Sequence, residues 1–496
     1  MNKLSEVFVI EEKTEIEKVL ELITTNTNNV EKLSQIISLI EFPITLVLEN
    51  YYVDKVYRDI YYNYFSGKHF KYDRNCKRLS LFKGKYTLPE LYEKYKIGYL
   101  QKKFVGTIVL RPLQNGGIGR TLLNPLQLNL EKAYIRTTEF DVEILGMLLK
   151  VNAFPFSEQD SETMTCAETT IWAILEYYGT RYPEYKVVLP NEIIRAVDKI
   201  SCQRVTPSMG LDYYTVSGVL KEFGFQPRVY AADSYSKKEV YKKIFHYYVE
   251  SGIPIGVGTS LPSMQSGHST VCIGHADSDR KITGAVCEKG LYFFDSCNFY
   301  DKYVTIDDNQ IPYKVESFED FTLYHPAEVD VFVVPLYKRI VLEADKAATC
   351  LEFWLSAMTD VLKQILQQNN IINCNGNPII KRVFLTSSRK FKSFRVKNSE
   401  SSEEMKIYGD VLYPKFLWVM EIATYDMYKD NKVCGEIVID ATSAQSDWRD
   451  YLISLRVMNY MGYRKPDEGI QDLINRFEYS NMNFVNEYNM YINNLE

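Results

Sequence analysis

The pattern of apolar and polar residues predicts helices at the start of the chain and strands after them. Apolar residues recur every three or four positions in IEKVLELI and VEKLSQIISLI, which places them on one helix face. We predict two amphipathic helices there, ending at Pro43, because proline does not continue a helix. Residues 51–65 fit a helix or a strand, since their aromatic side chains favour strands while their charges suit a helix face. Residues 104–150 have a strand pattern around a glycine-rich turn.

A helix is predicted next, within SETMTCAETTIWAILEYYG, and its first residue can be identified from the sequence. Thr165 precedes it as a cap, and Glu168, three residues later, completes a capping-box pattern. An apolar stripe then faces a core until Gly179 ends the helix. Two further helices are predicted near residues 211–223 and 237–250. The strands predicted after them span residues 253–259, 269–274, 291–294 and 303–306.

The sequence from residue 327 onward has its own pattern of elements. It begins with the strand-like VDVFVVPL, continues with a helix near residues 344–367 and a charged loop at residues 387–405, and resumes with the strands FLWVMEI and GEIVIDAT. Its end has a polar, helical pattern. We therefore divide the chain into three segments: residues 1–150, helical and then rich in strands; residues 151–326; and residues 327–496, an α+β region of unknown role.

Length and charge narrow the class of protein. A chain of 496 residues exceeds what one hydrophobic core usually supports, so two or three domains are expected. Its net charge of -6, with scattered Lys and Arg, gives no basic surface for nucleic acid or an anionic membrane. The first twenty residues mix Glu and Lys where a signal peptide has an unbroken apolar run, and no segment reaches the roughly 18 apolar residues of a membrane span. We expect a cytoplasmic protein without nucleic-acid or membrane partners.

The cysteines indicate reduced thiols. There are 9, an odd number spread through the chain, and no CxxC pair that is typical of a zinc site. Cys272 and His275 form a CxxH, but a spacing of three on a strand places them on opposite faces. We expect neither a metal nor a cofactor.

Cys166 is the best candidate for a nucleophile. It occupies the first position of the predicted helix, where unpaired backbone N–H groups and the helix dipole favour an anion, so a thiolate forms more easily there. A lone cysteine is more often a small buried residue. The residues that accompany Cys166 favour the catalytic interpretation.

His268 is the expected base. It begins a predicted strand in SGHSTVCIGHA, after a glycine that lets other backbone approach, and the chain has only 5 histidines. A thiol nucleophile needs such a group within hydrogen-bond reach. His275 lies seven positions on and is the weaker candidate, because an odd step on a strand points to the other face.

A carboxylate is expected to orient the imidazole, and a side-chain donor to bind the oxyanion. Strand ends supply Asp307, which we prefer, with Asp308 and Asp295 as alternatives. Each also fits a simple turn-forming aspartate. Gln159, seven residues before Cys166, is the candidate donor, with a solvent-exposed loop residue as the alternative interpretation.

In this order of Gln, Cys, His and Asp, the sequence resembles the papain-like cysteine peptidases, and most of all the bacterial C39-like peptidases. The resemblance covers residues 150–325 and depends on CAETTIWAILEYYG, GHSTVCIGH and the later strand that ends in Asp. It implies an α+β fold in which the helix bearing Cys166 packs on an antiparallel sheet carrying His268. It also implies the roles of nucleophile, base, orienting acid and oxyanion donor for Cys166, His268, Asp307 and Gln159. The long interval between His268 and Asp307 implies an inserted hairpin at residues 277–300, or else favours Asp295.

These expectations define a cysteine hydrolase, a peptidase or isopeptidase, that cleaves an amide bond through an acyl-enzyme. Its substrate would be a protein or peptide, and the N- and C-terminal regions would serve substrate selection or a regulatory partner. Two alternatives remain. The same triad serves acyl transfer to an amine, as in transglutaminase-like enzymes, and a catalytically silent papain-like binding module would have an inert Cys166 thiol.

Overall fold

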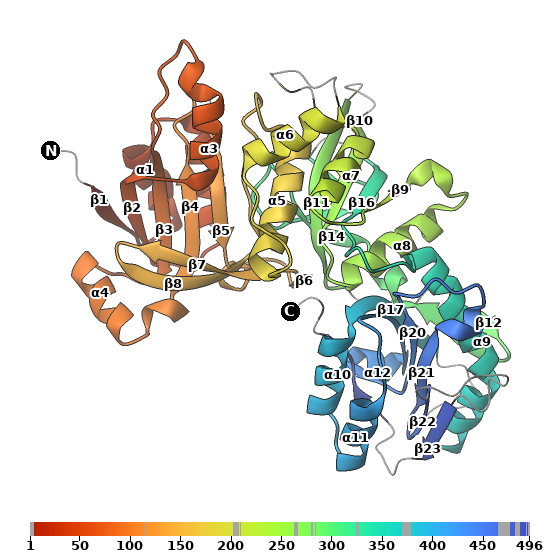
Figure 1. The fold of residues 1–496 in the computed structure, drawn as a ribbon. Coiled ribbons are helices and arrows are strands. Elements are labelled where there is room, and N and C mark those ends of the chain that lie inside the picture. Colours follow the sequence, from red (N-terminus) through yellow and green to blue (C-terminus); the bar gives the residue numbers. More distant parts are fainter. Residues whose placement is uncertain are drawn as a thin grey trace. The chain divides into compact units, whose positions relative to one another are not determined.

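A computed structural model describes residues 4–114, 116–201, 208, 210–261, 266–278, 281–282, 284–323, 327–369, 378–464, 477–481, 487–492 and 494. The chain forms two compact units, each built from three separate segments of the sequence. The first unit comprises Met1–Ser234, Pro254–Ala276 and Lys302–Pro335, and the second comprises Tyr235–Ile253, Asp277–Asp301 and Leu336–Glu496. Both contain helices and largely antiparallel sheets, which confirms the predicted α+β class (Figure 1). This division differs from the three consecutive segments drawn from the sequence, because the chain enters the second unit three times.

The N-terminal part of the first unit is a five-stranded antiparallel meander. Its strands, in spatial order, are β1 (Ser5–Ile10), β2 (Ile44–Tyr52), β3 (Cys76–Lys83), β4 (Phe104–Leu110) and β5 (Ile118–Leu123). Its helices are α1 (Ile16–Ile23), α2 (Thr27–Ile37), α3 (Lys55–Asn63) and α4 (Leu88–Lys96). The first two match the predicted amphipathic pair. The ambiguous residues 51–65 divide between the end of β2 and α3, because the Asp54 side chain caps α3 by accepting from the Tyr57 N–H at 2.8 Å.

The second sheet of the first unit is antiparallel and carries the candidate site. Its strand order is β15 (Lys314–Ser317), β14 (Lys302–Ile306), β11 (Ser266–Ala276), β10 (Ile255–Leu261), β16 (Val329–Val334) and β9 (Arg228–Ala231), with β6 (Ala133–Ile135) paired to β11. The hairpin of β7 (Thr138–Ile144) and β8 (Met147–Ala153) precedes α5 (Cys166–Arg181), α6 (Pro190–Ile200) and α7 (Tyr213–Glu222). β16 corresponds to VDVFVVPL, which was expected to begin the C-terminal region. It instead pairs with β10 and β9 in the first unit.

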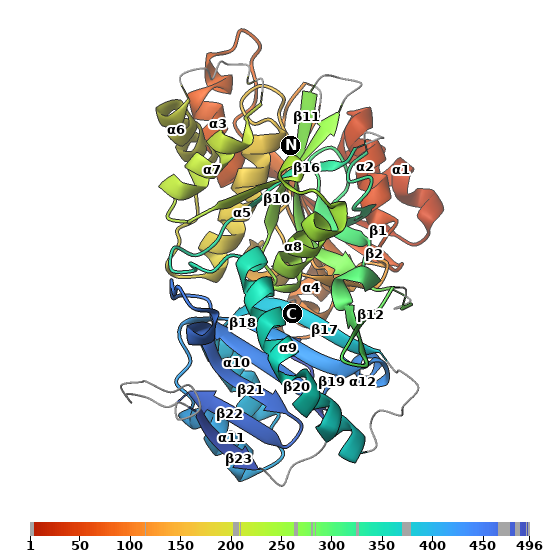
Figure 2. The ribbon, with the colours of Figure 1, turned by 90° about the vertical axis from the view of Figure 1, so that its right-hand side faces the viewer.

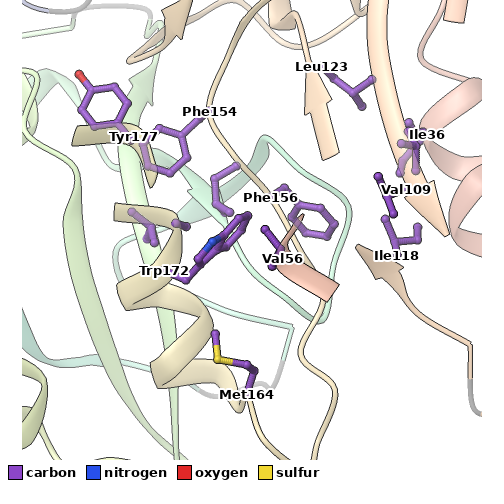
Figure 3. Packing of buried hydrophobic residues seen from close by; sticks show 14 of the residues in the cluster. Ile36, Val56, Val109, Ile118, Leu123, Phe154, Phe156, Met164, Trp172 and Tyr177 are labelled. Atoms are coloured by element: carbon purple, nitrogen blue, oxygen red, sulfur yellow. The ribbon is translucent and has the colours of Figure 1, made fainter. Parts of the chain in front are cut away.

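Helix α5 packs on this sheet along β11 (Figure 1). Figure 3 shows Trp172 of α5 among Phe154, Phe156 and Met164, all buried in one apolar cluster. The helix continues past Gly179, where the sequence suggested its end. Glycine is required there for a different reason: a Cβ at this position would lie 2.5 Å from the backbone of Lys186. The sheet and this close approach together hold the helix, and so Cys166 at its start.

The second unit is built around a mixed eight-stranded sheet. Its order is β12 (Val286–Glu288), β13 (Leu291–Asp295), β17 (Ile379–Ser387), β18 (Phe416–Thr424), β20 (Gly435–Asp440), β21 (Leu452–Val457), β22 (Tyr460–Arg464) and β23 (Phe477–Asn481), and β19 (Lys432–Val433) pairs with β24 (Tyr488–Asn489). Its helices are α8 (Lys238–Glu250), α9 (Ala344–Gln368), α10 (Ser388–Lys397), α11 (Ser402–Asp410) and α12 (Tyr425–Lys429). Trp418 of β18 contacts Tyr248 of α8, while its neighbours Leu417 and Val419 pack with α10 and α11. Helices therefore cover both faces, with α9 along one of them (Figure 2).

Two sequence expectations in the second unit were wrong. Residues 387–405 form mainly α10 and α11 and not a charged loop, because Phe391 and Phe394 turn one face of α10 into the core. The end of the chain, after the strand GEIVIDAT, was expected to be helical, yet β21 and β22 continue the sheet there. Part of that expectation, at residues 465–476 and 482–486, lies outside the described residues. Among the helices that the structure describes, none combines the length and apolarity needed to cross a membrane.

Candidate active site

Cys166 is the first residue of α5, and the segment before it is rigidly organised. The backbone N–H of Thr165 donates to the Glu168 carboxylate at 3.3 Å, as the capping box predicted. Upstream, one oxygen of Asp160 accepts from the backbone N–H groups of Glu162, Thr163 and Met164 at 2.9, 2.7 and 2.9 Å. The thiol is half-buried. It therefore lies at the positive end of a 16-residue helix while keeping some access to solvent.

His268 and Asp307 meet because their strands pair. His268 lies on β11, and Asp307 directly follows β14, which pairs antiparallel with β11. The His268 Nε2 and Asp307 Oδ1 atoms are 2.9 Å apart, and both side chains are buried. Asp307 is fixed in turn by the Asn309 backbone N–H at 2.9 Å and the Thr322 hydroxyl at 3.0 Å. Asp307 thus orients the His268 imidazole, and Asn309 and Thr322 fix the position of Asp307.

The charges at this site favour a protonated imidazole. Burial lowers the pKa of His268, but hydrogen bonds to Asp307 and Cys166 and the negative charge of both outweigh it, raising that pKa to about 10. Burial likewise opposes the ionisation of Asp307, yet the hydrogen bond from His268 holds the Asp307 pKa below its usual range. Because Nε2 faces Asp307, the other ring nitrogen, Nδ1, is left for the Cys166 thiol. The arrangement is that of a thiol beside a protonated imidazole that a carboxylate orients.

This pair makes stability depend on pH. The His268 pKa is about 10 in the folded chain and about 6.5 when unfolded, so the folded state holds an extra proton between these values. The extra proton on His268 stabilises the folded state by at most about 5 kcal/mol. This contribution is complete below pH 6.5 and is lost as pH rises toward 10. Urea unfolding at pH 7 and pH 9.5 should therefore show a larger loss of unfolding free energy in the wild type than in His268→Gln. The same loss in both proteins would contradict this pairing, since other alkaline titrations affect both equally.

Gln159 reaches the site through Asn309. Its side-chain N–H donates to the Asn309 Oδ1 at 3.0 Å, and the Asn309 Nδ2 lies 3.5 Å from the His268 Nε2. Arg111 holds the Gln159 segment by donating to the carbonyl oxygens of Glu158 and Gln159 at 3.0 and 3.1 Å. Asn309 and Arg111 were not predicted from the sequence. Neither has a sequence signal of its own, although Asn309 lies only two residues beyond Asp307.

The two alternative acids occupy different places. Asp308 is buried beside the pair, with its Oδ1 3.8 Å from the His268 Nε2, and burial raises its pKa to about 7. Asp295 belongs to the second unit, where its carboxylate accepts from the Tyr247 hydroxyl at 2.6 Å and lies 2.9 Å from the Lys243 Nζ. Burial opposes its ionisation, but Lys243 lowers the Asp295 pKa to about 2. The structure thus brings Asp307 and Asp308 to His268, and gives Asp295 partners within the second unit.

The inserted segment and the weaker histidine also have clear positions. Residues 277–301 leave the first unit between β11 and β14, and contribute the β12–β13 hairpin to the sheet of the second.

His275 is buried near the end of β11, with its Nδ1 3.1 Å from the Ala276 carbonyl oxygen and its ring centroid 5.2 Å from that of Tyr134. Cys272 is fully buried, and burial raises its pKa to about 12.

A cavity of about 550 Å³ is lined by residues of α2, by residues 158–162 before Cys166 and by residues 308–311 after Asp307, while Cys166, His268 and Asp307 themselves are not among its lining residues. Gln159 and Asp308 both line it.

His268, Asp307 and Asp308 form a cluster whose possible ligand atoms lie within 4.8 Å of one another. In the described part of the chain, this is the one place where three His, Cys, Asp or Glu side chains meet at metal-binding spacing. The direct His268–Asp307 contact at 2.9 Å places a proton between those two atoms. The geometry fits acid–base chemistry with the neighbouring thiol.

No protein-family model matches the sequence, and no curated protein matches it.

Proposed function

We propose that the chain is a cytoplasmic cysteine hydrolase with a papain-like core, a peptidase or isopeptidase that cleaves an amide bond in a protein or peptide. The observation that carries the proposal is the buried contact of 2.9 Å between His268 and Asp307, with Cys166 as the second partner of the same imidazole. The position of Cys166 at the start of α5, packed on the strand that bears His268, supports it. A nucleophile, a base and an orienting acid are the minimum that such chemistry needs.

In the proposed reaction the Cys166 Sγ attacks the carbonyl carbon of the substrate. The oxyanion that forms would accept from the Cys166 backbone N–H and from the Gln159 side chain, once that amide is released from Asn309. His268 then gives its proton to the departing amine as the C–N bond breaks, leaving a thioester on Cys166. The neutral imidazole takes a proton from water, whose oxygen attacks the thioester and releases the acid. Asp307 keeps the ring oriented and balances the imidazolium charge throughout.

Acid quenching during incubation with a mixed peptide library tests the proposal. Mass spectrometry should find the Cys166 peptide heavier by an acyl fragment, with new peptide N-termini accumulating in solution. Acylated Cys166 whose products carry an added amine, with no free acid, would instead establish acyl transfer. Absence of both the adduct and any product, across the library and at neutral pH, would leave a catalytically silent binding module. The second unit and the N-terminal meander are the candidates for substrate selection or a regulatory partner.

A further inference from the structure

The cavity lined by residues 158–162 and 308–311 contains one buried carboxylate that has no hydrogen-bond donor in the part of the chain that the structure describes, that of Asp308. Asp308 lines it and is only 5% exposed, and neither carboxylate oxygen has a hydrogen-bond partner among the described residues. A buried carboxylate without donors is costly, because it has lost its hydrogen bonds to water and has gained no hydrogen bond in exchange. In native structures such a group is completed by an ordered water, an ion or a ligand, stores strain, or takes part in chemistry. His268 is the nearest cation, and its Nε2 is 3.8 Å away and already faces Asp307.

The other acidic residues of the cavity are already occupied. Its carboxylates are Glu31, Glu158, Asp160, Glu162 and Asp308. Glu158 pairs with Lys32 and accepts from the Ile118 N–H at 2.6 Å, and Asp160 accepts from three backbone N–H groups. Glu162 pairs with Lys68, while Glu31 is exposed to water. Asp308 is therefore the acceptor that a ligand would find vacant.

The charge of the cavity indicates the sign of that ligand. Five carboxylates and two lysines, Lys32 and Lys314, line it, which gives -5 + 2 = -3 with all groups ionised. Lys32 is neutralised by Glu158, and Lys314 is exposed. A cation entering a cavity of this charge is attracted, and it forms the strong, charge-assisted kind of hydrogen bond with a buried carboxylate.

We propose that Asp308 binds a protonated amine of the substrate in this cavity, so that the enzyme selects amide substrates that carry an ammonium group. The inference rests on the proposed function for its meaning in catalysis, although the binding itself does not require catalysis. The ammonium group has two possible sources, a lysine side chain and a free peptide N-terminus. At about 550 Å³ the cavity has room for either with its adjoining chain.

Binding to the full chain carrying Cys166→Ala tests this without turnover. Isothermal titration would compare Nα-acetyl-lysine methylamide with its neutral isostere, Nα-acetyl-norleucine methylamide. Leucine methylamide, which has a free α-amine, represents the peptide N-terminus. We expect at least one of the charged probes to bind about 10–100-fold more tightly than the norleucine probe, in line with one charge-assisted hydrogen bond. Whichever charged probe binds more tightly identifies the source of the amine.

Two variants assign the effect to Asp308. Asp308→Asn keeps the shape of the side chain and should lower the affinity for the charged probe to that of norleucine. Glu31→Gln removes the same charge from the exposed rim of the cavity and should change affinity less than about twofold, because exposed charges are screened. Equal affinity for charged and neutral probes in the Cys166→Ala chain would overturn the proposal, whatever Asp308→Asn does. Unchanged binding in Asp308→Asn, or an equal loss in Glu31→Gln, would overturn it too. A protein that binds ammonium but never cleaves an amide would refute only the proposed function.

Discussion

Cys166→Ala is expected to lower the rate of amide cleavage by about 10⁴–10⁶-fold, the loss that follows removal of a nucleophile acting as one unit with its base. The change removes the sulfur that would form the acyl-enzyme. It should leave the fold intact, because Cys166 is half-buried at the helix start and alanine is a good helix former. The measurement is kcat/KM on peptides found in the library screen, with urea unfolding of both proteins alongside.

Cys287→Ala is the matched control for this loss. Cys287 is an exposed cysteine on β12, in the second unit, and its replacement should change kcat/KM less than about twofold. A Cys166→Ala protein that retained more than a tenth of the wild-type rate would remove Cys166 from the mechanism. A large loss in Cys287→Ala would point to a different thiol.

Asp307→Ala should lower kcat/KM by about 10²–10⁴-fold, the range seen when the residue that orients a catalytic histidine is removed. His268 would lose its acceptor at 2.9 Å, and with it much of the charge that raises its pKa to about 10. The alkaline limb of the pH–rate profile should therefore move to lower pH. A general loss of packing would lower the rate without moving that limb, so the profile between pH 5 and pH 10 separates the two effects.

Asp308→Ala distinguishes the neighbouring carboxylate. It leaves the His268–Asp307 contact in place, so on a substrate without an amine it should cost less than about tenfold in kcat/KM and leave the alkaline limb where it was. The opposite result, with Asp308→Ala shifting the limb and Asp307→Ala leaving it unchanged, would assign the orienting role to Asp308.

Local sequence chemistry was enough to place the nucleophile. Thr165 and Glu168 defined the start of α5 to the residue, because a capping box depends only on neighbours in the chain. The end of the same helix was misjudged at Gly179, whose need for glycine comes from Lys186 in a following loop. A contact of that kind has no signature in the pattern of apolar residues.

The pairing of strands is the part of the site that the sequence pattern could not predict. The pattern located the strands bearing His268 and preceding Asp307, but it did not show that residues 277–301 leave for another unit in between. There Phe293 of β13 pairs in parallel with Ile379 of β17, a long-range contact that no local periodicity encodes. His275 was expected to point away from His268 because side chains alternate strictly along a regular strand, but a register shift between Cys272 and Gly274 interrupts that alternation. The buried, unsatisfied Asp308 likewise emerges only from the folded arrangement.

The most direct test of the central claim is mass spectrometry of the native protein after brief exposure to low iodoacetamide, in the wild type and in His268→Ala. Of the seven cysteines that the structure describes, five are buried, and burial raises the pKa of Cys272, Cys350 and Cys434 to about 12, so these should not react. Cys287 is exposed and serves as the reference thiol. We expect Cys166 to be labelled first and well ahead of Cys287 in the wild type, and to lose that lead in His268→Ala. Labelling of Cys166 that is no faster than that of Cys287, or that is unchanged without His268, would contradict an activated Cys166–His268 pair.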